Sequence, residues 1–460
     1  MKTINIYNYL FYVLTLMCML MLWGCEDFLE TDEPSGQIKD VTIFENEASA
    51  TAAITTLYAK LRDDVLITGT SQGLGAQMGM YTDELNFYAS PGYTLEAFYQ
   101  HQLLASNPSV LKIWNSSYNL IYLANAAIEG IENSDLLSAS VKNQLIGEAM
   151  FVRGMIHFYL VNLFDAIPYI TTTSYQDNKS VSRMSVNEVY VHIVEDLQAA
   201  KELLGENYLT NERTRANRYV VSALLARVYL YMEEWEKAEL ESSLLIDNTA
   251  LFNISSSLTE EFLISNPSGI LRLKTKMAGY SPNESSTFVF VSGPPSVMSL
   301  REDFVASMEE GDLRRTHWVG IVTNGTTTWY HSHKYKQNNP AQYSVVFRLS
   351  EQYLIRAEAR ARQNNLVGAQ QDINIIRNRA GLQNTSASTS DELLEAILAE
   401  RRYELFVEHG HRWFDLRRLS KAAEVLAPIK PNWDAKNINL PIPETELSMN
   451  PNLLPQNFGY

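Results

Sequence analysis

Apolar residues recur at spacings of three and four along most of this chain, a pattern that predicts amphipathic helices. In the N-terminal half the predicted helices span 44–62, 110–131, 141–164, 186–204, 215–232 and 235–247. In the C-terminal part they span 350–363, 366–380 and 391–408. Ser185 followed by Glu188 is a capping-box signature, so we expect one of these helices to begin there. The sequence therefore predicts a mainly α-helical protein.

Small and large residues alternate along two neighbouring predicted helices. Ala223, Ala226 and Tyr229 lie in the first, and Trp235 and Ala238 open the second. This alternation suits close antiparallel packing and resembles tetratricopeptide repeats, although its period is irregular. We expect repeat-like helical pairs.

The character of the chain changes between residues 248 and 347, where Gly, Pro, Ser and Thr become frequent. Within this loop-rich insertion, β-rich residues flank Asn324-Gly325, a strong signal for a short β-hairpin. A two-residue turn would pair Gly320 with Trp329 and Trp318 with His331. Alternation then places Trp318, Trp329 and His331 on one face, where an uncovered indole could stack on a sugar ring. The alternative is that this face is the packed inner side of the hairpin.

A second aromatic segment lies between residues 81 and 99. Its rings are Tyr81, Phe87, Tyr88, Tyr93, Phe98 and Tyr99. Polar residues, including Asp83 and Glu84, stand between them, and Pro91-Gly92 breaks the segment. Aromatic rings beside carboxylates and amides suit carbohydrate recognition, because rings cover the apolar sugar face and polar groups bond to hydroxyls. We expect about half of these rings to be buried.

The N-terminus carries an apolar run from Tyr9 to Trp23 that ends at Gly24-Cys25. The run suits a signal peptide and is too short for a membrane span of roughly 20 residues. A lipoprotein signal peptidase needs a small residue before a cysteine, so we predict a signal peptide at 1–24 and lipidation of Cys25. The alternative is an ordinary secretory signal with an incidental cysteine.

Residues 25–42 are acidic, contain Pro34 and Gly36, and predict an extended tether. After the tether we expect one body with three parts. These are an N-terminal helical part at 43–247, the insertion at 248–347, and C-terminal helices with an extended tail at 348–460.

Charge and cysteine content exclude several classes of protein. The formal net charge is −16, and removing residues 1–24 takes away only Lys2, which leaves −17. This balance argues against nucleic-acid binding. Cys18 lies in the removed segment, so the mature chain has no cysteine pair for a disulfide or a thiolate metal site.

No motif in the sequence singles out catalysis. We find no nucleophile elbow, no phosphate-binding glycine loop and no HExxH, and His331-Ser332-His333 lacks a nearby carboxylate for a metal site. Glu400, Glu404 and Glu408 share a helix face, and Arg401, Arg412 and Arg417 are the candidate partners. We interpret these charges as a structural ion-pair network rather than an active site. We expect no enzyme activity, no cofactor and no metal.

Several segments, in this order, resemble the SusD/RagB family of outer-membrane nutrient-binding lipoproteins of Bacteroidetes. The start Cys25-Glu26-Asp27-Phe28-Leu29-Glu30 resembles the lipidated cysteine and acidic tether of that family. The resemblance continues through the motifs FRLSEQYLIRAEA (347–359), NIIRNRAGL (374–382), ERRYEL (400–405) and HRWFDLRR (411–418). The ending, with LPIP at 440–443 and NPNL at 450–453, is similar as well.

This resemblance implies a fold in which four tetratricopeptide-like helix pairs support a loop-rich part. It implies that the protein is not an enzyme. It also implies that the protein lies on the outer leaflet as a lid over a TonB-dependent, SusC-like barrel and helps to deliver an oligosaccharide into that barrel. It also implies that Glu26 and Asp27 serve as a surface-export signal. The family's ligands contact aromatics from the loop after the first helix and from the irregular middle. The expected glycan-binding residues are therefore Asp83, Glu84, Tyr88, Tyr93, Trp318, Trp329 and His331.

Two other functions stay open at the level of the sequence. An envelope glycoside hydrolase needs only two carboxyl groups about 5–9 Å apart, and carboxylates are plentiful here. A helical-repeat assembly factor would bind protein only. The sequence also leaves open which glycan is bound, or whether a peptide takes its place.

Overall fold

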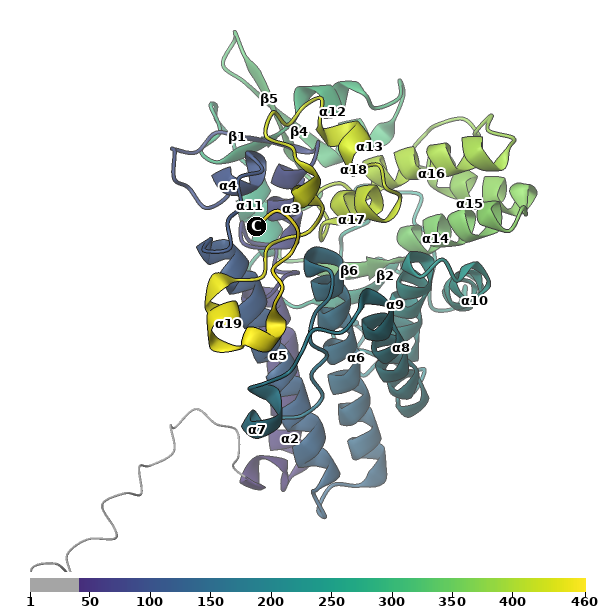
Figure 1. Ribbon diagram of the computed structural model, residues 1–460. Helices are drawn as coiled ribbons and strands as arrows, with labels where there is room; N and C mark the ends of the chain where they lie inside the picture. Colours follow the sequence, from purple (N-terminus) through teal and green to yellow (C-terminus); the bar gives the residue numbers. More distant parts are fainter. Residues whose placement is uncertain (1–40) are drawn as a thin grey trace, which may run out of the picture. The chain divides into compact units, whose positions relative to one another are not determined.

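The computed structural model describes residues 41–460 (Figure 1). The predicted lipidation site Cys25, the signal peptide 1–24 and the tether up to residue 40 lie outside these residues. Residues Val41–Tyr460 form one compact unit. Within it, no helix has both the length and the apolar character needed to cross a bilayer.

The N-terminal half is a series of helices that pack on one another in chain order. After a 3₁₀ turn at η1 (Val41–Phe44) come α2 (Glu47–Asp63), α5 (Pro108–Glu132), α6 (Ala139–Phe164), α8 (Val186–Leu203), α9 (Arg218–Tyr231) and α10 (Trp235–Ile246). Each of α5, α6, α8 and α9 contacts the next of these helices in sequence, as Figure 1 shows for α5 and α6. All six predicted helices of this half are confirmed, with small differences at their ends.

The capping residues explain where these helices begin. The Ser185 hydroxyl accepts from the Glu188 amide at 3.4 Å, and the Glu188 carboxylate accepts from the Ser185 amide at 2.9 Å. The predicted capping box at the start of α8 is therefore confirmed. Asn46 and Asn107 cap α2 and α5 by accepting from a backbone amide of the first turn, without a reciprocal bond.

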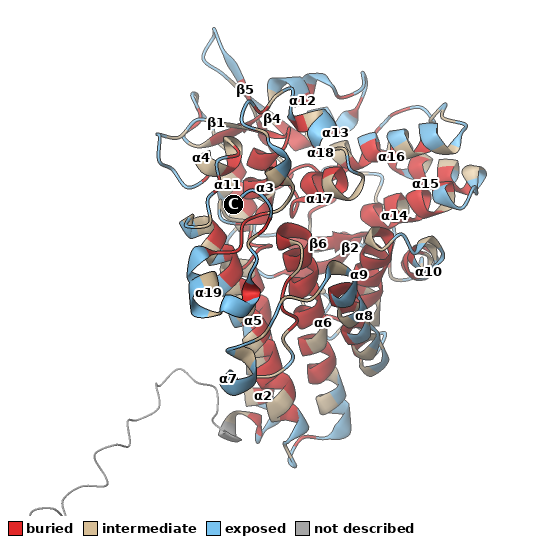
Figure 2. Ribbon diagram, in the orientation of Figure 1, coloured by how far each residue is buried: buried red, intermediate tan, exposed pale blue. Residues whose placement is uncertain are grey.

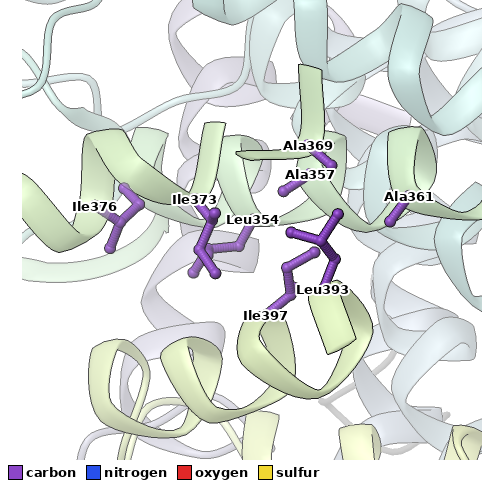
Figure 3. Packing of buried hydrophobic residues seen from close by; sticks show 8 residues of the cluster. All are labelled: Leu354, Ala357, Ala361, Ala369, Ile373, Ile376, Leu393 and Ile397. Carbon is purple, nitrogen blue, oxygen red and sulfur yellow. The ribbon is translucent and has the colours of Figure 1, made fainter. Parts of the chain in front are cut away.

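The C-terminal helices α14 (Leu349–Arg362), α15 (Leu366–Arg379) and α16 (Ser390–Glu404) pack around one apolar cluster. Figure 3 shows the contributing side chains, Leu354, Ala357, Ala361, Ala369, Ile373, Ile376, Leu393 and Ile397. The prediction that the third helix reaches residue 408 is wrong, because α16 ends at Glu404. A turn follows, in which Val407 and His409 have positive φ, before α17 (His411–Arg418) begins.

Short elements complete this part. They are α18 (Ala422–Leu426), η2 (Ala435–Ile438), α19 (Glu444–Met449) and η3 (Pro451–Leu453). In the other half, α3 (Leu74–Tyr81), α4 (Glu96–Tyr99) and α7 (Tyr175–Asn178) lie between the longer helices.

The loop-rich insertion supplies three short helices and all the strands of residues 41–460 except the first, and the last strand ends just beyond it. The helices are α11 (Asn283–Phe288), α12 (Glu302–Ala306) and α13 (Leu313–Trp318). A four-stranded antiparallel sheet has the order β1 (Leu85–Phe87), β3 (Met298–Leu300), β5 (Thr328–Ser332) and β4 (Val319–Thr323). A second sheet joins β2 (Gly269–Leu273) to β6 (Ser344–Arg348), and both of these strands are fully buried. The fold is thus mainly α with a few short antiparallel strands, as predicted.

The predicted hairpin is present, but its register differs from the prediction. Gly320 pairs with His331 and Val322 pairs with Trp329, because the connection contains four residues instead of two. The Asn324 side chain accepts from the amides of Thr326 and Thr327 at 3.1 and 2.9 Å, which closes this longer turn. Asn324-Gly325 thus marked the place of the turn correctly, and the side-chain bonds of Asn324 set its length.

Burial is concentrated where the helical half meets the strands. Figure 2 shows α6 and α9 buried along most of their lengths, whereas the tip of the β4–β5 hairpin is exposed. The segment 81–99 and the hairpin on either side of Asn324-Gly325, which the sequence marked for ligand binding, both contribute to the four-stranded sheet. Their side chains are therefore the ones to examine for a site.

Candidate ligand-binding surface

The turn after strand β1 presents two tyrosines to solvent. Tyr88 is 40% exposed and Tyr93 is 38% exposed. The Tyr88 amide donates to the carbonyl of Val297, the residue just before β3, at 2.8 Å. The chain then turns away through Pro91 and Gly92, whose φ is +87°. We call residues 88–94 the tyrosine turn.

The tyrosine turn is fixed at both ends. The Gly92 amide donates to the Glu96 carboxylate at 2.6 Å, and the Tyr93 amide donates to the Ser90 carbonyl at 3.2 Å. Buried Leu85 and Leu95 anchor the chain on either side. The exposed rings are therefore held on a closed turn.

Two further rings, Phe87 and Tyr99, support Tyr93. The centre of Phe87 lies 6.4 Å from the centre of Tyr93 and 6.1 Å from that of Tyr99. The Lys430 ammonium lies 4.1 Å from the centre of Tyr99 and donates to the Met80 carbonyl at 2.7 Å. Tyr99 is thereby tied to the core, and Tyr93 belongs to a packed aromatic cluster.

Asp83 does not reach a ligand surface, which corrects its predicted role. Its carboxylate is buried and accepts two hydrogen bonds from Arg412, at 2.8 and 2.9 Å, and pairs with Arg402 at 2.8 Å. These two cations lower the pKa of Asp83, although burial alone opposes that shift. Asp83 therefore fastens α3 to the C-terminal helices.

Glu84 is buried as well, so its predicted contact with sugar hydroxyls is also wrong. The Val407 amide donates to its carboxyl at 3.3 Å. Burial raises the pKa of Glu84 to about 8, with the charge of neighbouring Asp83 as the second cause. Glu84 holds the turn after α16 against the aromatic segment 81–99.

Trp318 is not part of the hairpin face. It is the last residue of α13, is completely buried, and its indole N–H donates to the Leu258 carbonyl at 2.8 Å. The ring packs beside Phe262, with 5.6 Å between centres. The expectation of an exposed ring at this position is wrong, because a helix rather than a strand precedes Val319.

Trp329 and His331 do share one face of β5, but the chain itself covers that face. Trp329 is only 7% exposed, and a Cβ on Gly293 would lie 2.1 Å from its ring. Phe290 packs over His331 with 5.0 Å between ring centres. The segment 289–295, which we call the covering loop, thus occupies the predicted aromatic platform, as the packed-side alternative expects.

The predicted carboxylate stripe forms an ion-pair network, but with different cations. Glu404 accepts from Arg348 and Arg379 and lies 3.3 Å from Arg314, and all four side chains are buried. Glu408 pairs with Arg348 at 2.9 Å and with Lys334 at 2.5 Å. The three arginines proposed from sequence bind elsewhere: Arg401 pairs with Asp415, Arg412 with Asp83, and Arg417 with Asn439 and Asp165.

Within residues 41–460, no three His, Cys, Asp or Glu side chains are grouped so that they could hold a metal ion. His331 and His333 lie with ring centres 5.5 Å apart, and burial lowers the pKa of both, that of His333 to about 4. The two imidazoles are packed side chains in this structure.

A hollow of about 510 Å³, which the sequence did not lead us to expect, lies between α5, α7 and α19. Its lining includes Asn115, Tyr118, Asn119 and Tyr122 on one face of α5. Their spacing of three, four and seven residues was the signal that could have revealed this polar aromatic face. A search for apolar periodicity alone does not reveal this face, because it counts tyrosines as core residues.

Comparison with known proteins places the chain in a family. A family model described as "Starch-binding associating with outer membrane" matches residues 27–230, and the model described as "SusD family" matches residues 309–460. A SusD-like protein of Formosa agariphila is 28% identical, over 97% of this chain and 98% of that protein.

Solved structures agree with this assignment at the level of the fold. A SusD superfamily protein of Bacteroides vulgatus is similar with a TM-score of 0.77 and 21% identity, covering 91% of this chain and 100% of that one. A laminarin-binding SusD-like protein gives a TM-score of 0.75 with 23% identity, covering 90% and 100%. The two family models, the curated relatives and these folds together show that this chain belongs to the SusD/RagB family of carbohydrate-binding proteins.

Proposed function

We propose that this protein is a non-enzymatic, lipid-anchored receptor that captures an oligosaccharide and passes it to a SusC-like, TonB-dependent barrel in the outer membrane. The observation that carries the proposal is the tyrosine turn, where Tyr88 and Tyr93 are exposed on a closed and supported loop. A phenol ring can cover the C–H face of a pyranose while its hydroxyl bonds to the sugar.

The absence of catalysis is part of this proposal. Asp83 and Glu84, the two acidic residues that the sequence grouped with the exposed tyrosines, are buried and bound to protein groups. A glycosidase needs one carboxyl as acid and another as base or nucleophile on either side of the bond to be cleaved. The expected result is that no reducing ends appear when a bound polysaccharide is incubated with the protein.

The decisive experiment is isothermal calorimetry with a panel of neutral polysaccharides. The panel begins with laminarin, because a solved relative of the same fold is described as laminarin-binding, and includes starch, because one family model is described as starch-binding. A carrier must release its ligand, so we expect dissociation constants of about 1 μM to 1 mM, roughly −8 to −4 kcal/mol.

Substitutions in the tyrosine turn test the site itself. Tyr88→Ala and Tyr93→Ala should each weaken binding by about tenfold, since one aromatic contact contributes roughly 0.5–1.5 kcal/mol beyond its buried area. Tyr88→Phe and Tyr93→Phe keep the rings and serve as matched controls that should retain most of the affinity. Unchanged binding by both alanine variants would remove the tyrosine turn from the ligand site.

The anchor is tested separately in cells that make the full-length chain. Cys25→Ser should move the protein from the membrane fraction to the soluble envelope fraction, because the acyl chains supply about 0.8 kcal/mol per buried methylene and a body of net charge −17 is not attracted to anionic lipid. Cys18→Ser is the control and should not change the fractionation. A Cys25→Ser protein that stays in the membrane would contradict the lipoprotein assignment.

A further inference from the structure

The hollow between α5, α7 and α19 has a composition that the family assignment does not explain. It is lined by residues from one face of α5, from the segment 168–181 and from the C-terminal segment 446–453. Figure 1 shows α5, α7 and α19 grouped together, apart from the β1 and α4 elements that carry the tyrosine turn. Its volume of about 510 Å³ lies within the range of roughly 300–1,000 Å³ that is typical of small-molecule sites.

The wall on α5 alternates amides and phenols. Asn115, Tyr118, Asn119 and Tyr122 occur at i, i+3, i+4 and i+7, which places them in one row along the helix. Tyr175, which is 75% exposed, is the corresponding ring on the opposite side. The hollow thus presents aromatic faces with amide groups between them.

The walls are held in place by hydrogen bonds. The Tyr118 hydroxyl donates to the Pro168 carbonyl at 2.9 Å, and its ring centre lies 4.8 Å from that of buried Trp114. The side-chain amide of Asn178 donates to the Thr172 carbonyl at 2.7 Å, and the side-chain amide of Asn450 donates to the Val181 carbonyl at 2.8 Å. The hollow is therefore pre-formed, and a ligand would not have to order its walls.

The remaining polar groups favour a neutral ligand. The side chains of Asn115 and Asn119 are exposed and make no hydrogen bond to another residue of the described chain 41–460. One cation, Lys179, and one carboxyl, Glu446, also line the hollow, and burial raises the pKa of Glu446. Because the lining holds one group of each sign, it offers no net charge to select a phosphate or a strongly charged peptide.

We propose that this hollow is a second carbohydrate-binding site, which takes a short neutral oligosaccharide. The rings of Tyr122 and Tyr175 stack against pyranose faces, and the amides of Asn115 and Asn119 exchange hydrogen bonds with hydroxyls. The site is separate from the tyrosine turn and extends the binding of a long glycan to a second place on the molecule. Two weak sites that engage one chain bind it more tightly than either site alone.

The test measures binding of the neutral trisaccharides maltotriose, laminaritriose and cellotriose to the full-length folded protein. For a trisaccharide that occupies both places, the stoichiometry should be two per protein. Tyr175→Ala combined with Asn119→Ala should lower the stoichiometry to one, or weaken the affinity of the hollow for the trisaccharide by at least tenfold. Both side chains are exposed, and circular dichroism checks that the fold is retained. Val367→Ala, at an exposed position of α15 that does not line the hollow, is the control and should bind as the wild type does.

The double variant Tyr88→Ala with Tyr93→Ala separates this inference from the proposed function. Binding that survives in this variant and disappears in the Tyr175/Asn119 double variant supports the second site and removes the tyrosine turn. Binding lost only in the Tyr88/Tyr93 variant overturns the second site and leaves the proposed function in place. Absence of binding of all three trisaccharides overturns the second site, while the polysaccharide panel still tests the tyrosine turn.

Discussion

Asp83 and Glu84 are neighbours in sequence, but their carboxyl groups are in opposite electrostatic situations. Two arginines lower the pKa of Asp83, whereas burial raises the pKa of Glu84 to about 8. Sequence analysis grouped them as two acids between tyrosines, because only the fold shows that Arg402 and Arg412 reach one of them. Their chemistry belongs to stability and not to ligand binding.

The pH dependence of unfolding should therefore differ in sign between variants at these two positions. The raised pKa of Glu84 means that its contribution is fully present below about pH 4.5 and is lost as the pH rises through about 8. Relative to Glu84→Gln, the wild type should thus lose stability between pH 5 and pH 8. The lowered pKa of Asp83 has the opposite effect, since that stability is present above the unfolded pKa of roughly 3.9 and is lost as the pH falls.

Urea unfolding at pH 3.5, 5, 6.5 and 8 measures both effects. The difference in the free energy of unfolding between wild type and Asp83→Asn should be constant from pH 5 to pH 8 and should shrink at pH 3.5. The difference between wild type and Glu84→Gln should change across the upper interval instead. Parallel pH profiles for the two variants would show that the assigned environments are wrong.

At the scale of elements, the sequence predicted the helices well and the exposure of the hairpin poorly. The apolar period predicted the ends of the nine long helices to within a few residues, except at the C-terminal end of α16. There the chain turns, with positive φ values at Val407 and His409. Asn324-Gly325 located the β4–β5 turn. The burial of Trp329 depends on Gly293, a residue from a distant loop, and no local pattern reports such a contact.

Gly293 should control whether the covering loop can lie on Trp329. In Gly293→Ala the new Cβ would lie 2.1 Å from the Trp329 ring, so the loop or the ring must shift. We expect a loss of about 1–3 kcal/mol in the free energy of unfolding and greater solvent access to the indole. Fluorine NMR of 5-fluorotryptophan-labelled protein, with the resonance assigned through Trp329→Phe, measures that access.

Gly205→Ala is the matched control, because a Cβ at Gly205 would meet no atom within 4 Å. Its tryptophan spectrum and its stability should remain close to those of the wild type. An unshifted Trp329 resonance in Gly293→Ala would show that the covering loop does not rest on this ring.

At the scale of the whole molecule, buried charges join parts of the chain that are far apart in sequence. Arg314 comes from α13, Arg348 from the end of β6 and Arg379 from α15, and all three meet Glu404 at the end of α16. The sequence indicated the carboxylates, because they share a helix face. It assigned the wrong arginines, because these approach from segments that only the tertiary structure brings together.

Glu404→Gln should destabilise the whole unit of residues 41–460. Removing one partner from a buried ion-pair network leaves uncompensated charge, so we expect a loss of roughly 3–5 kcal/mol in the free energy of unfolding. Lys274→Ala breaks an exposed pair with Glu212, 3.0 Å long, and should cost about 1 kcal/mol or less. Chemical denaturation of the two variants compares them directly, and equal losses would mean that the Glu404 network contributes no more than a surface pair.

The tyrosine turn begins at the end of an edge strand and lies between two buried leucines, Leu85 and Leu95. Loops closed in this way tolerate changes of length far better than the strands and helices that carry them. A segment of different length and composition can therefore be grafted into positions 88–94 without repacking the interior. Under the function proposed above, ligand preference can then be exchanged between relatives by transplanting one short stretch of chain onto an unaltered scaffold.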